Sequence, residues 1–142
     1  KEVGIDGLIL PDLPLAEYEA HYKTTFEKYD LYNIFLITPQ TSEARIQQID
    51  KASKGFIYMV SSAGTTGAKT TFENTQEAYF NKIDSLALKN PQIVGFGISN
   101  ATTFKQATKK AKGAIIGSAF IKMLTEKGID GVSEFIKSIR PL

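Results

Sequence analysis

Short apolar runs recur along the chain at intervals that suit a repeating strand and helix. Each run is continuous rather than alternating, which is typical of strands that are covered on both faces in a parallel sheet. The runs lie at residues 7–10, 34–37, 56–60, 93–96 and 114–116. We therefore predict five buried parallel strands.

The segments between these runs have apolar residues at helical spacing. In the first segment, Leu15, Tyr18, Tyr22, Phe26 and Tyr29 are three or four residues apart and form one stripe. Four more helices are expected. The first follows Thr41 and has the predicted core positions Ile46 and Ile49, and the second lies within residues 72–88 with Ala78, Ile83 and Leu86. The third follows an Asn100 cap and has Phe104 and Ala107, and the fourth runs from about residue 129 to Pro141 with Val132, Phe135, Ile136 and Ile139.

A strand followed by a helix, five times over, predicts a parallel βα architecture. No linker or low-complexity segment divides the 142 residues, so we expect one domain over residues 1–142. Two arrangements fit this pattern. One is an open five-stranded sheet, and the other is part of an eight-stranded barrel, which normally needs about 250 residues.

Composition excludes several function classes. The 17 basic and 15 acidic residues are scattered and leave a net charge of +2, so no basic face predicts nucleic-acid binding. No apolar run approaches the roughly 18 residues that cross a bilayer, so we expect no membrane partner. With no cysteine and no cluster of metal-ligand residues, the sequence predicts neither a disulfide nor a metal site, and it favours the cytoplasm.

Two glycine loops follow the last two predicted strands. Ligands meet the carboxyl ends of parallel strands, and these loops begin at Gly97 and at Gly117, which precedes Ser118. A glycine lets backbone N–H groups approach an anion, and a helix N-terminus favours phosphate. We predict a phosphate site with a short helix over residues 119–124. The alternative is two tight turns that need glycine for steric reasons.

The two glycine loops also predict which strands of a barrel the chain contains. Barrels that bind phosphate place the site after their seventh and eighth strands. Counting back makes the first strand here the fourth, so strands one to three are expected to be missing. Lys1 to Gly4 then resembles the end of a third helix with its glycine stop.

The stretch YMVSSAGTTGAK, residues 58–69, has two glycines but not the spacing or ending of a nucleotide P-loop. We interpret Gly64, Thr65, Thr66 and Gly67 as a lid that changes conformation at low cost. An ordinary surface loop is the alternative.

Among charged residues, Asp12 is the best-placed carboxylate because it follows the first strand directly. It is flanked by prolines, however, and equally suits the cap of the helix that begins near Leu15. His21 and Lys122 are expected to be surface residues on helices.

Four stretches together resemble the tryptophan synthase alpha subunit family: residues 4–14, 58–69, 94–99 and 116–122. The resemblance covers the whole chain, but only the family's C-terminal part, from barrel strand four to strand eight. It implies a partial (β/α)8 barrel and a lyase of tryptophan biosynthesis, which cleaves indole-3-glycerol phosphate to indole and glyceraldehyde 3-phosphate by a retro-aldol reaction. It also implies an α2β2 complex with a beta subunit, which carries the pyridoxal phosphate, whereas the alpha subunit has no cofactor.

The resemblance also implies roles for particular residues. They are Gly67, Gly97, Gly117 and Ser118 around the substrate phosphate, Tyr58, Phe96, Ile9 and Leu36 in the substrate pocket, Gly64, Thr65 and Thr66 in the lid, and Asp12 and Pro14 on the loop near the beta subunit.

One departure from the family is severe. The family's catalytic glutamate lies on its second strand and its aspartate on the loop that follows, and this chain matches neither segment. We therefore expect no catalytic residue in the chain and no activity from the chain alone. Two alternatives remain: another phosphate-binding barrel enzyme of the same pathway, or a non-catalytic module that binds a phosphorylated metabolite.

Overall fold

The computed structural model describes residues 1–61 and 74–140. Its strands are β1 (Gly7–Ile9), β2 (Tyr32–Ile34), β3 (Leu36–Ile37), β4 (Ile57–Val60), β5 (Gln92–Gly95) and β6 (Gly113–Ala114). Every pairing is parallel, with the order β1-β2 in one sheet and β3-β4-β5-β6 in the other. Only Phe35 separates β2 from β3, so these two form one interrupted strand, and the five predicted strand positions are confirmed.

The helices follow the strands as predicted. They are α1 (Leu15–Glu17), the π-helical η1 (Tyr18–Tyr22), α2 (Lys23–Lys28), α3 (Glu43–Ala52), α4 (Asn74–Ser85), α5 (Ala101–Thr108), α6 (Ser118–Lys127), the 3₁₀ helix η2 (Ile129–Gly131) and α7 (Val132–Ile139). No helix among the described residues is long and apolar enough to cross a membrane.

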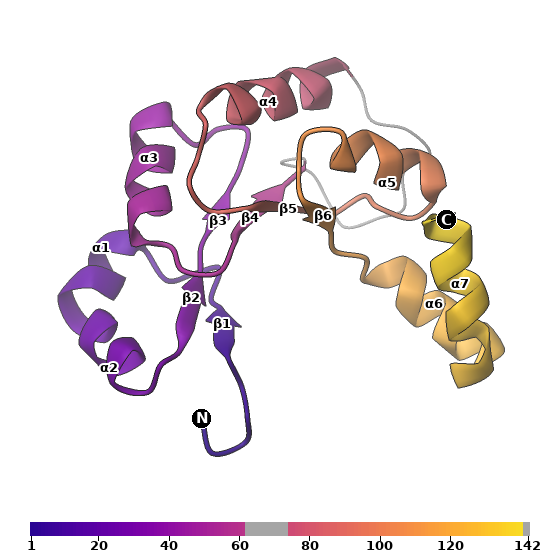
Figure 1. Ribbon diagram of the computed structural model, residues 1–142, viewed down its shortest axis with the longest axis horizontal. Helices are drawn as coiled ribbons and strands as arrows, with labels where there is room; N and C mark the ends of the chain where they lie inside the picture. Colours follow the sequence, from indigo (N-terminus) through magenta and orange to yellow (C-terminus); the bar gives the residue numbers. More distant parts are fainter. Residues whose placement is uncertain (62–73, 141–142) are drawn as a thin grey trace.

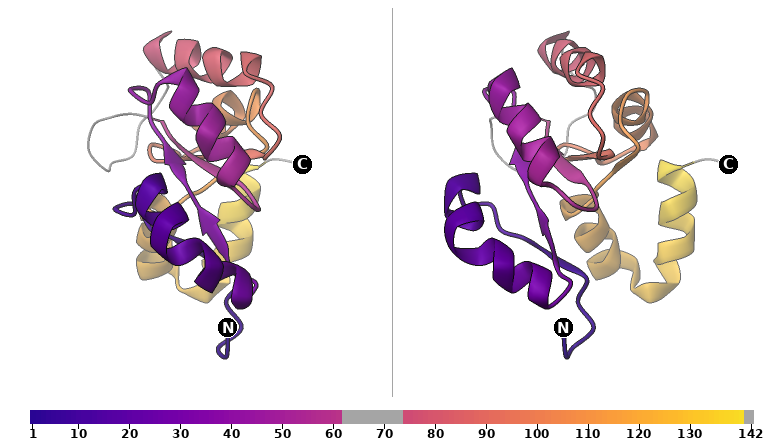
Figure 2. Two further views of the ribbon diagram at one scale, coloured as in Figure 1. Left: turned by 90° about the vertical axis from the view of Figure 1, so that its left-hand side faces the viewer. Right: turned by 60° about the vertical axis from the view of Figure 1, so that its left-hand side comes forward.

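The strands form a curved arch with helices along its outer side (Figures 1 and 2). Among the strands in the described part of the chain, neighbours in the sheet are neighbours in the sequence, and none is inserted between earlier ones. A doubly wound open sheet instead reverses its strand order and carries helices on both faces. The arrangement is therefore that of a partial (β/α)8 barrel, as predicted, and not that of an open sheet.

The core lies between the strands and the outer helices. Ile37, Ile57 and Val94 from three neighbouring strands are fully buried, and Ile46 of α3 and Ile83 of α4 pack on them. At about 25 cal/mol per Å² of apolar surface removed from water, this layer is the main stabilising contribution of the fold.

The first helix departs from its predicted stripe. Leu15, Tyr18 and Phe26 are buried, but Tyr22 and Tyr29 are 47% and 48% exposed. The π-helical turn over Tyr18–Tyr22 explains the difference. Its hydrogen bonds skip one more residue than those of an α-helix, and this takes Tyr22 out of the α-helical register, whereas Phe26 beyond the turn is still buried.

Two other predicted core positions are wrong. Ala78 is exposed on α4, where Tyr79 and Phe80 are buried instead. Ile136 on α7 is 55% exposed, because α7 packs against α5 and α6 while this side chain lies in a groove. Residues 1–4 form a turn, in which Gly4 has φ +82° and its N–H donates to the Lys1 carbonyl at 2.9 Å.

Candidate functional site

The carboxyl ends of β4, β5 and β6 lie side by side. The Ser61 N–H donates to the Gly95 carbonyl at 3.1 Å, and the Ile115 N–H donates to the Val94 carbonyl at 2.8 Å, so both ladders continue one residue past the strands. Val94 pairs with Ala114, and Gly97 and Gly117 each lie three residues further along. The two glycine loops that the sequence singled out therefore meet at one edge of the sheet.

The loop after β5 has an unusual backbone. Phe96 and Gly97 both adopt left-handed conformations, with φ of +66° and +76°. This conformation is open to glycine at no cost but is strained for a residue with a Cβ, which makes Phe96 a local outlier. The Phe96 ring packs edge-on against Tyr58, with centroids 5.9 Å apart.

The same loop is tied to the start of α5. Asn100 is the predicted cap, and its side chain accepts a hydrogen bond from the Thr103 N–H at 2.9 Å. The Thr103 hydroxyl in turn accepts from the Asn100 N–H at 3.3 Å and also from the Ser99 N–H at 3.1 Å, and Thr103 is fully buried. This reciprocal capping box fixes the backbone directly after Gly97.

Gly117 differs from Gly97 in its backbone conformation and in its surroundings. Its φ is −101°, outside the left-handed region, and a Cβ added there would meet no described atom within 4 Å. Packing against the described residues therefore does not require glycine at position 117. Among these residues, the space next to it is open.

Gly117 also caps α6, which is longer than predicted. The Ile121 N–H donates to the Gly117 carbonyl at 3.0 Å, so the N–H groups of residues 118–120 precede the first helical bond. Unpaired N–H groups at the start of a ten-residue helix favour an anion. The Ser118 hydroxyl is exposed at the same point.

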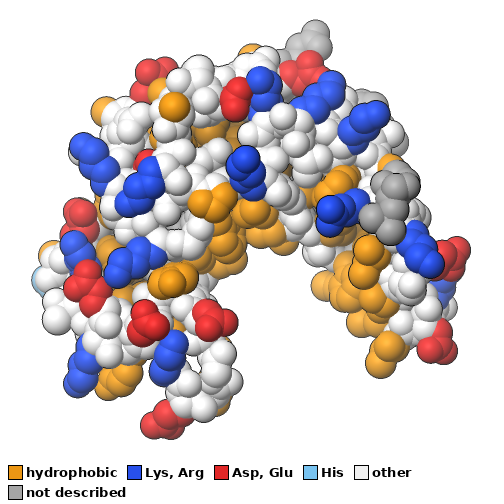
Figure 3. All heavy atoms as spheres, in the orientation of Figure 1, with side chains coloured by type: hydrophobic (Ala, Val, Ile, Leu, Met, Phe, Trp, Pro, Cys, Tyr) orange, Lys and Arg blue, Asp and Glu red, His pale blue; other side chains and the backbone are white. Residues whose placement is uncertain are grey.

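The predicted pocket residues share one face of the sheet. Leu36 pairs with Tyr58, and Ile9 pairs with Ile34, two residues before Leu36 on the same side. Burial raises the pKa of Tyr58 above its ordinary value, and its phenol, neutral at physiological pH in either case, is a hydrogen-bond donor. Hydrophobic side chains line this inner side of the arch (Figure 3).

Sequence reasoning missed the role of Gly95. A Cβ at Gly95 would overlap the Tyr58 ring, so the tyrosine lies directly over this backbone. The signal was present in the motif, where Gly95 and Gly97 flank Phe96 and only one glycine is needed for the left-handed turn.

Asp12 and Pro14 lie in the loop after β1, and both are exposed. Pro14 is the residue before α1, and the helix has no side-chain cap hydrogen bond. The interpretation of Asp12 as a cap is therefore wrong. His21 and Lys122 are surface residues as predicted, and they lie 3.7 Å and 3.9 Å from the carboxylates of Glu17 and Glu126.

Two predictions depend on what the structure describes. The lid residues Gly64, Thr65 and Thr66, with Gly67, lie outside the described residues. In residues 1–61 and 74–140, no group of three or more His, Asp or Glu residues is arranged to hold a metal ion.

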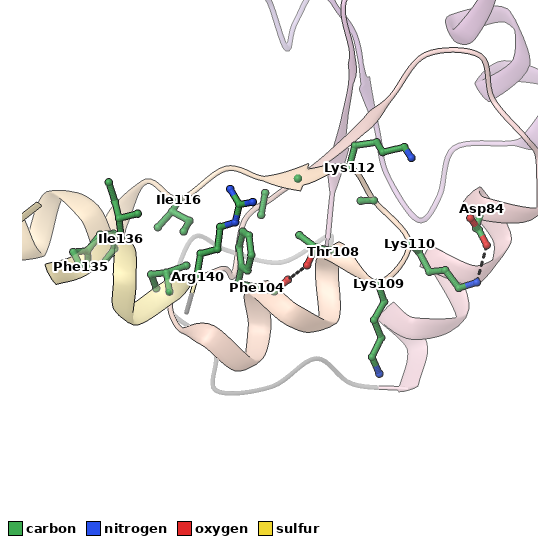
Figure 4. Close-up of a pocket in the computed structure, with 14 residues that line it drawn as sticks. Asp84, Phe104, Thr108, Lys109, Lys110, Lys112, Ile116, Phe135, Ile136 and Arg140 are labelled. Carbon is green, nitrogen blue, oxygen red and sulfur yellow. Dashed lines mark hydrogen bonds and ion pairs between the residues drawn. The ribbon is translucent and has the colours of Figure 1, made fainter. Parts of the chain in front are cut away.

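A groove of about 770 Å³ lies elsewhere, between α5, α7 and the strand β6 (Figure 4). Its rim carries Lys109, Lys112 and Arg140, and Lys110 is paired with Asp84 at 2.7 Å. Most of its lining comes from α7 and from residues before the carboxyl end of β6, so it is separate from the meeting point of the glycine loops.

Comparison with solved structures supports this architecture. The alpha subunit in the tryptophan synthase a2b2 complex of Pyrococcus furiosus superimposes with a TM-score of 0.83 at 27% identity, over 99% of this chain and 58% of that chain. The alpha subunit from Campylobacter jejuni gives 0.79 at 30% identity, over 97% and 55%. The fold is thus part of a (β/α)8 barrel.

The family follows from the sequence comparisons. The family described as "Tryptophan synthase alpha chain" matches residues 1–139, and the chain belongs to it. The tryptophan synthase alpha chains of Flavobacterium johnsoniae and Christiangramia forsetii are 65% and 58% identical, over 98% and 100% of this chain. The chain spans about half the length of these curated relatives, 55% and 56%.

Proposed function

We propose that this chain supplies the phosphate-binding part of a tryptophan synthase alpha subunit, a lyase that cleaves indole-3-glycerol phosphate to indole and glyceraldehyde 3-phosphate. The observation that carries the proposal is the space that the described residues leave open next to Gly117, beside the first amides of α6. Gly97 and Ser118 complete the site from the two loops, and Gly67 is assigned to it from the family resemblance.

The substrate's indole and glycerol parts are assigned to the inner face of the arch. There Tyr58 and Leu36 are neighbours in register, Phe96 contacts Tyr58, and Ile9 lies on the next strand pair. Retro-aldol cleavage needs a proton added to the indole ring and a proton removed from the glycerol hydroxyl. The resemblance places the family's two acids in segments that these 142 residues do not match, so we propose that these residues by themselves bind phosphate without turning over the substrate.

The proposed partner is a tryptophan synthase beta subunit. A related alpha subunit has been solved in an a2b2 complex from Pyrococcus furiosus. In this chain, Asp12 and Pro14 are exposed on the loop after β1 and are the proposed contact residues. We propose no cofactor for this chain, since pyridoxal phosphate belongs to the beta subunit.

The test is a calorimetric titration of the chain with glycerol 3-phosphate, beside an assay of indole release. We expect binding without turnover. Gly117→Asp places a carboxylate where the phosphate is expected, and it should weaken binding at least about tenfold through charge repulsion. Because aspartate suits a helix cap, the fold should survive.

Ser133→Asp is the matched control, since it adds the same charge to the exposed first turn of α7. It should leave the affinity for glycerol 3-phosphate unchanged. Equal affinity in Gly117→Asp and wild type would show that the phosphate site is elsewhere. Indole release by the chain alone would contradict the proposed lack of activity.

A further inference from the structure

We infer that Ser61 is a positioning residue for the substrate phosphate: its buried hydroxyl holds the Phe96–Gly97 peptide group so that the Gly97 N–H faces the loop of Gly117. This inference rests on the proposed function, because it concerns how the same phosphate site is built. Ser61 itself does not contact the ligand in this proposal.

The contacts of Ser61 are specific. Only 1% of its surface is exposed, and it lies directly after β4. Its N–H donates to the Gly95 carbonyl at 3.1 Å, and its hydroxyl donates to the Phe96 carbonyl at 2.5 Å. One residue of the β4 end therefore binds two consecutive carbonyls at the end of β5.

This pattern differs from a regular strand. In a strand, successive carbonyls point to opposite neighbours, so a carbonyl at Phe96 would ordinarily point away from β4. Here the left-handed angles of Phe96 and Gly97 turn the peptide group around, and its oxygen faces Ser61. The Ser61 hydroxyl provides this reversed carbonyl with a donor that the sheet ladder does not supply.

The reversal decides where the Gly97 N–H points. The Phe96 carbonyl and the Gly97 N–H belong to one planar trans peptide, so they point in opposite directions. With the oxygen held toward β4, the N–H points toward the other neighbour of β5, which is β6. The loop after β6 carries Gly117 and Ser118, so the reversal aims the Gly97 N–H at the proposed phosphate.

The reversed peptide needs support because it is strained. In the left-handed region the Cβ of a non-glycine residue crowds the backbone, and Phe96 bears that strain. The Ser61 hydrogen bond and the edge-on contact with Tyr58 offset it on one side. On the other side, the Ser99–Thr103 bond holds the loop to α5.

The test combines calorimetry with an NMR titration of the whole chain, using glycerol 3-phosphate as the probe. In the wild type, the backbone amide signals of Gly97 and Ser118 should both shift on binding. In Ser61→Ala, the Gly97 shift should be lost while the Ser118 shift remains, and the affinity should fall about tenfold, as expected for one lost hydrogen bond to a charged group.

Two variants separate positioning from stability. Ser61→Thr keeps the hydroxyl and should retain affinity within about threefold, which corresponds to less than one hydrogen bond. Ser53→Ala is the matched control, because Ser53 is also buried at 2% exposure but its hydroxyl has no partner among the described residues. It should change neither the affinity nor the Gly97 signal.

The outcomes are distinguishable. Absence of binding in the wild type would overturn the proposed function itself. Wild-type binding with an unchanged Gly97 shift and affinity in folded Ser61→Ala would overturn only the role of Ser61. If the alanine variant does not fold, Ser61→Cys gives the same test, since a thiol of similar size is a weaker donor and should reduce both the shift and the affinity.

Discussion

At the scale of single residues, three glycines near the proposed site serve three different physical needs. Gly97 adopts a left-handed angle, Gly95 lets the Tyr58 ring approach its backbone, and Gly117 leaves open space. A motif search treats all three alike. Because the causes differ, substitutions at the three positions should fail in different ways.

For Gly95→Ala we predict a loss of stability that depends on Tyr58. The added methyl group would overlap the tyrosine ring, and forcing extra volume into a packed site typically costs about 1–3 kcal/mol. In a Tyr58→Ala background the same substitution should cost almost nothing. Urea denaturation of the four proteins in a double-mutant cycle measures this coupling.

Gly113→Ala is the control for this prediction. Its Cβ would meet only the end of the Ile93 side chain, at 3.2 Å, and this end can move. It should lower the free energy of unfolding less than Gly95→Ala. A Gly95→Ala cost that persists without the Tyr58 ring would mean that the backbone, not the ring, requires glycine.

At the scale of elements, a buried carboxylate joins α3 to the start of β5. Asp50 is 6% exposed and accepts hydrogen bonds from the backbone N–H groups of Lys89 and Asn90, both at 2.9 Å. The Asn90 amide donates to the same carboxylate at 2.9 Å and to the Asp50 carbonyl at 2.7 Å. These hydrogen bonds hold the residues just before β5 in place, and the loop of the proposed site follows β5.

Asp50→Asn should destabilise the chain in a pH-dependent way. Desolvation raises the pKa of Asp50, but the hydrogen bonds from Asn90 and Lys89 outweigh it and hold the pKa below its ordinary value. The ionised form is thus favoured by folding, so its contribution is full above the unfolded pKa and is lost as the pH falls through the lower folded pKa.

At pH 7, we expect Asp50→Asn to lower the free energy of unfolding by about 2–3 kcal/mol, because buried donors lose a charged acceptor. The difference from wild type should shrink as the pH falls below about 4. Asp84→Asn is the control, since its exposed pair with Lys110 should contribute at most about 1 kcal/mol. A constant difference across pH would contradict the assignment of the effect to the carboxylate charge.

At the scale of the whole molecule, the arch has a hollow apolar side. Hydrophobic side chains gather along its inner surface (Figure 3), and Ile9 and Tyr32 on the first two strands are 43% and 40% exposed. Among the described strands, β1 and β6 each pair on one edge only. Contiguous apolar surface of this kind binds apolar partners or dyes.

We predict that the folded chain enhances the fluorescence of the dye ANS, which binds exposed hydrophobic surface. Ile9→Lys places a charge on the inner surface and should reduce the enhancement. Ile129→Lys changes an equally apolar side chain that is 82% exposed in the turn before α7, and it should have less effect. No enhancement from a chain with native circular dichroism would show that the inner surface is covered in solution.

Much of the fold was predictable because a strand that is buried on both faces is a continuous apolar run in the sequence. Runs such as residues 34–37 and 56–60 marked the strands, and Asn100 marked the start of α5 by its capping chemistry. The π-helical turn that exposes Tyr22 was not predictable, because spacing alone assumes an unbroken α-helix. Ile136 was misassigned because amphipathic spacing does not show which neighbour covers a face.

The strands and the family were thus readable from residue order, since apolar runs and glycine motifs are local properties. The partial barrel followed from the family resemblance, because the strand pattern alone also fitted an open sheet. Residue order also pointed to the loops of Gly97 and Gly117. It did not show which glycine adopts a left-handed backbone angle, which one makes room for a neighbouring side chain and which one borders open space. It also gave no sign of the hydrogen bond that Ser61 makes. Those distinctions depend on the register of β4, β5 and β6, which brings a serine and a carbonyl 35 positions apart into one hydrogen bond.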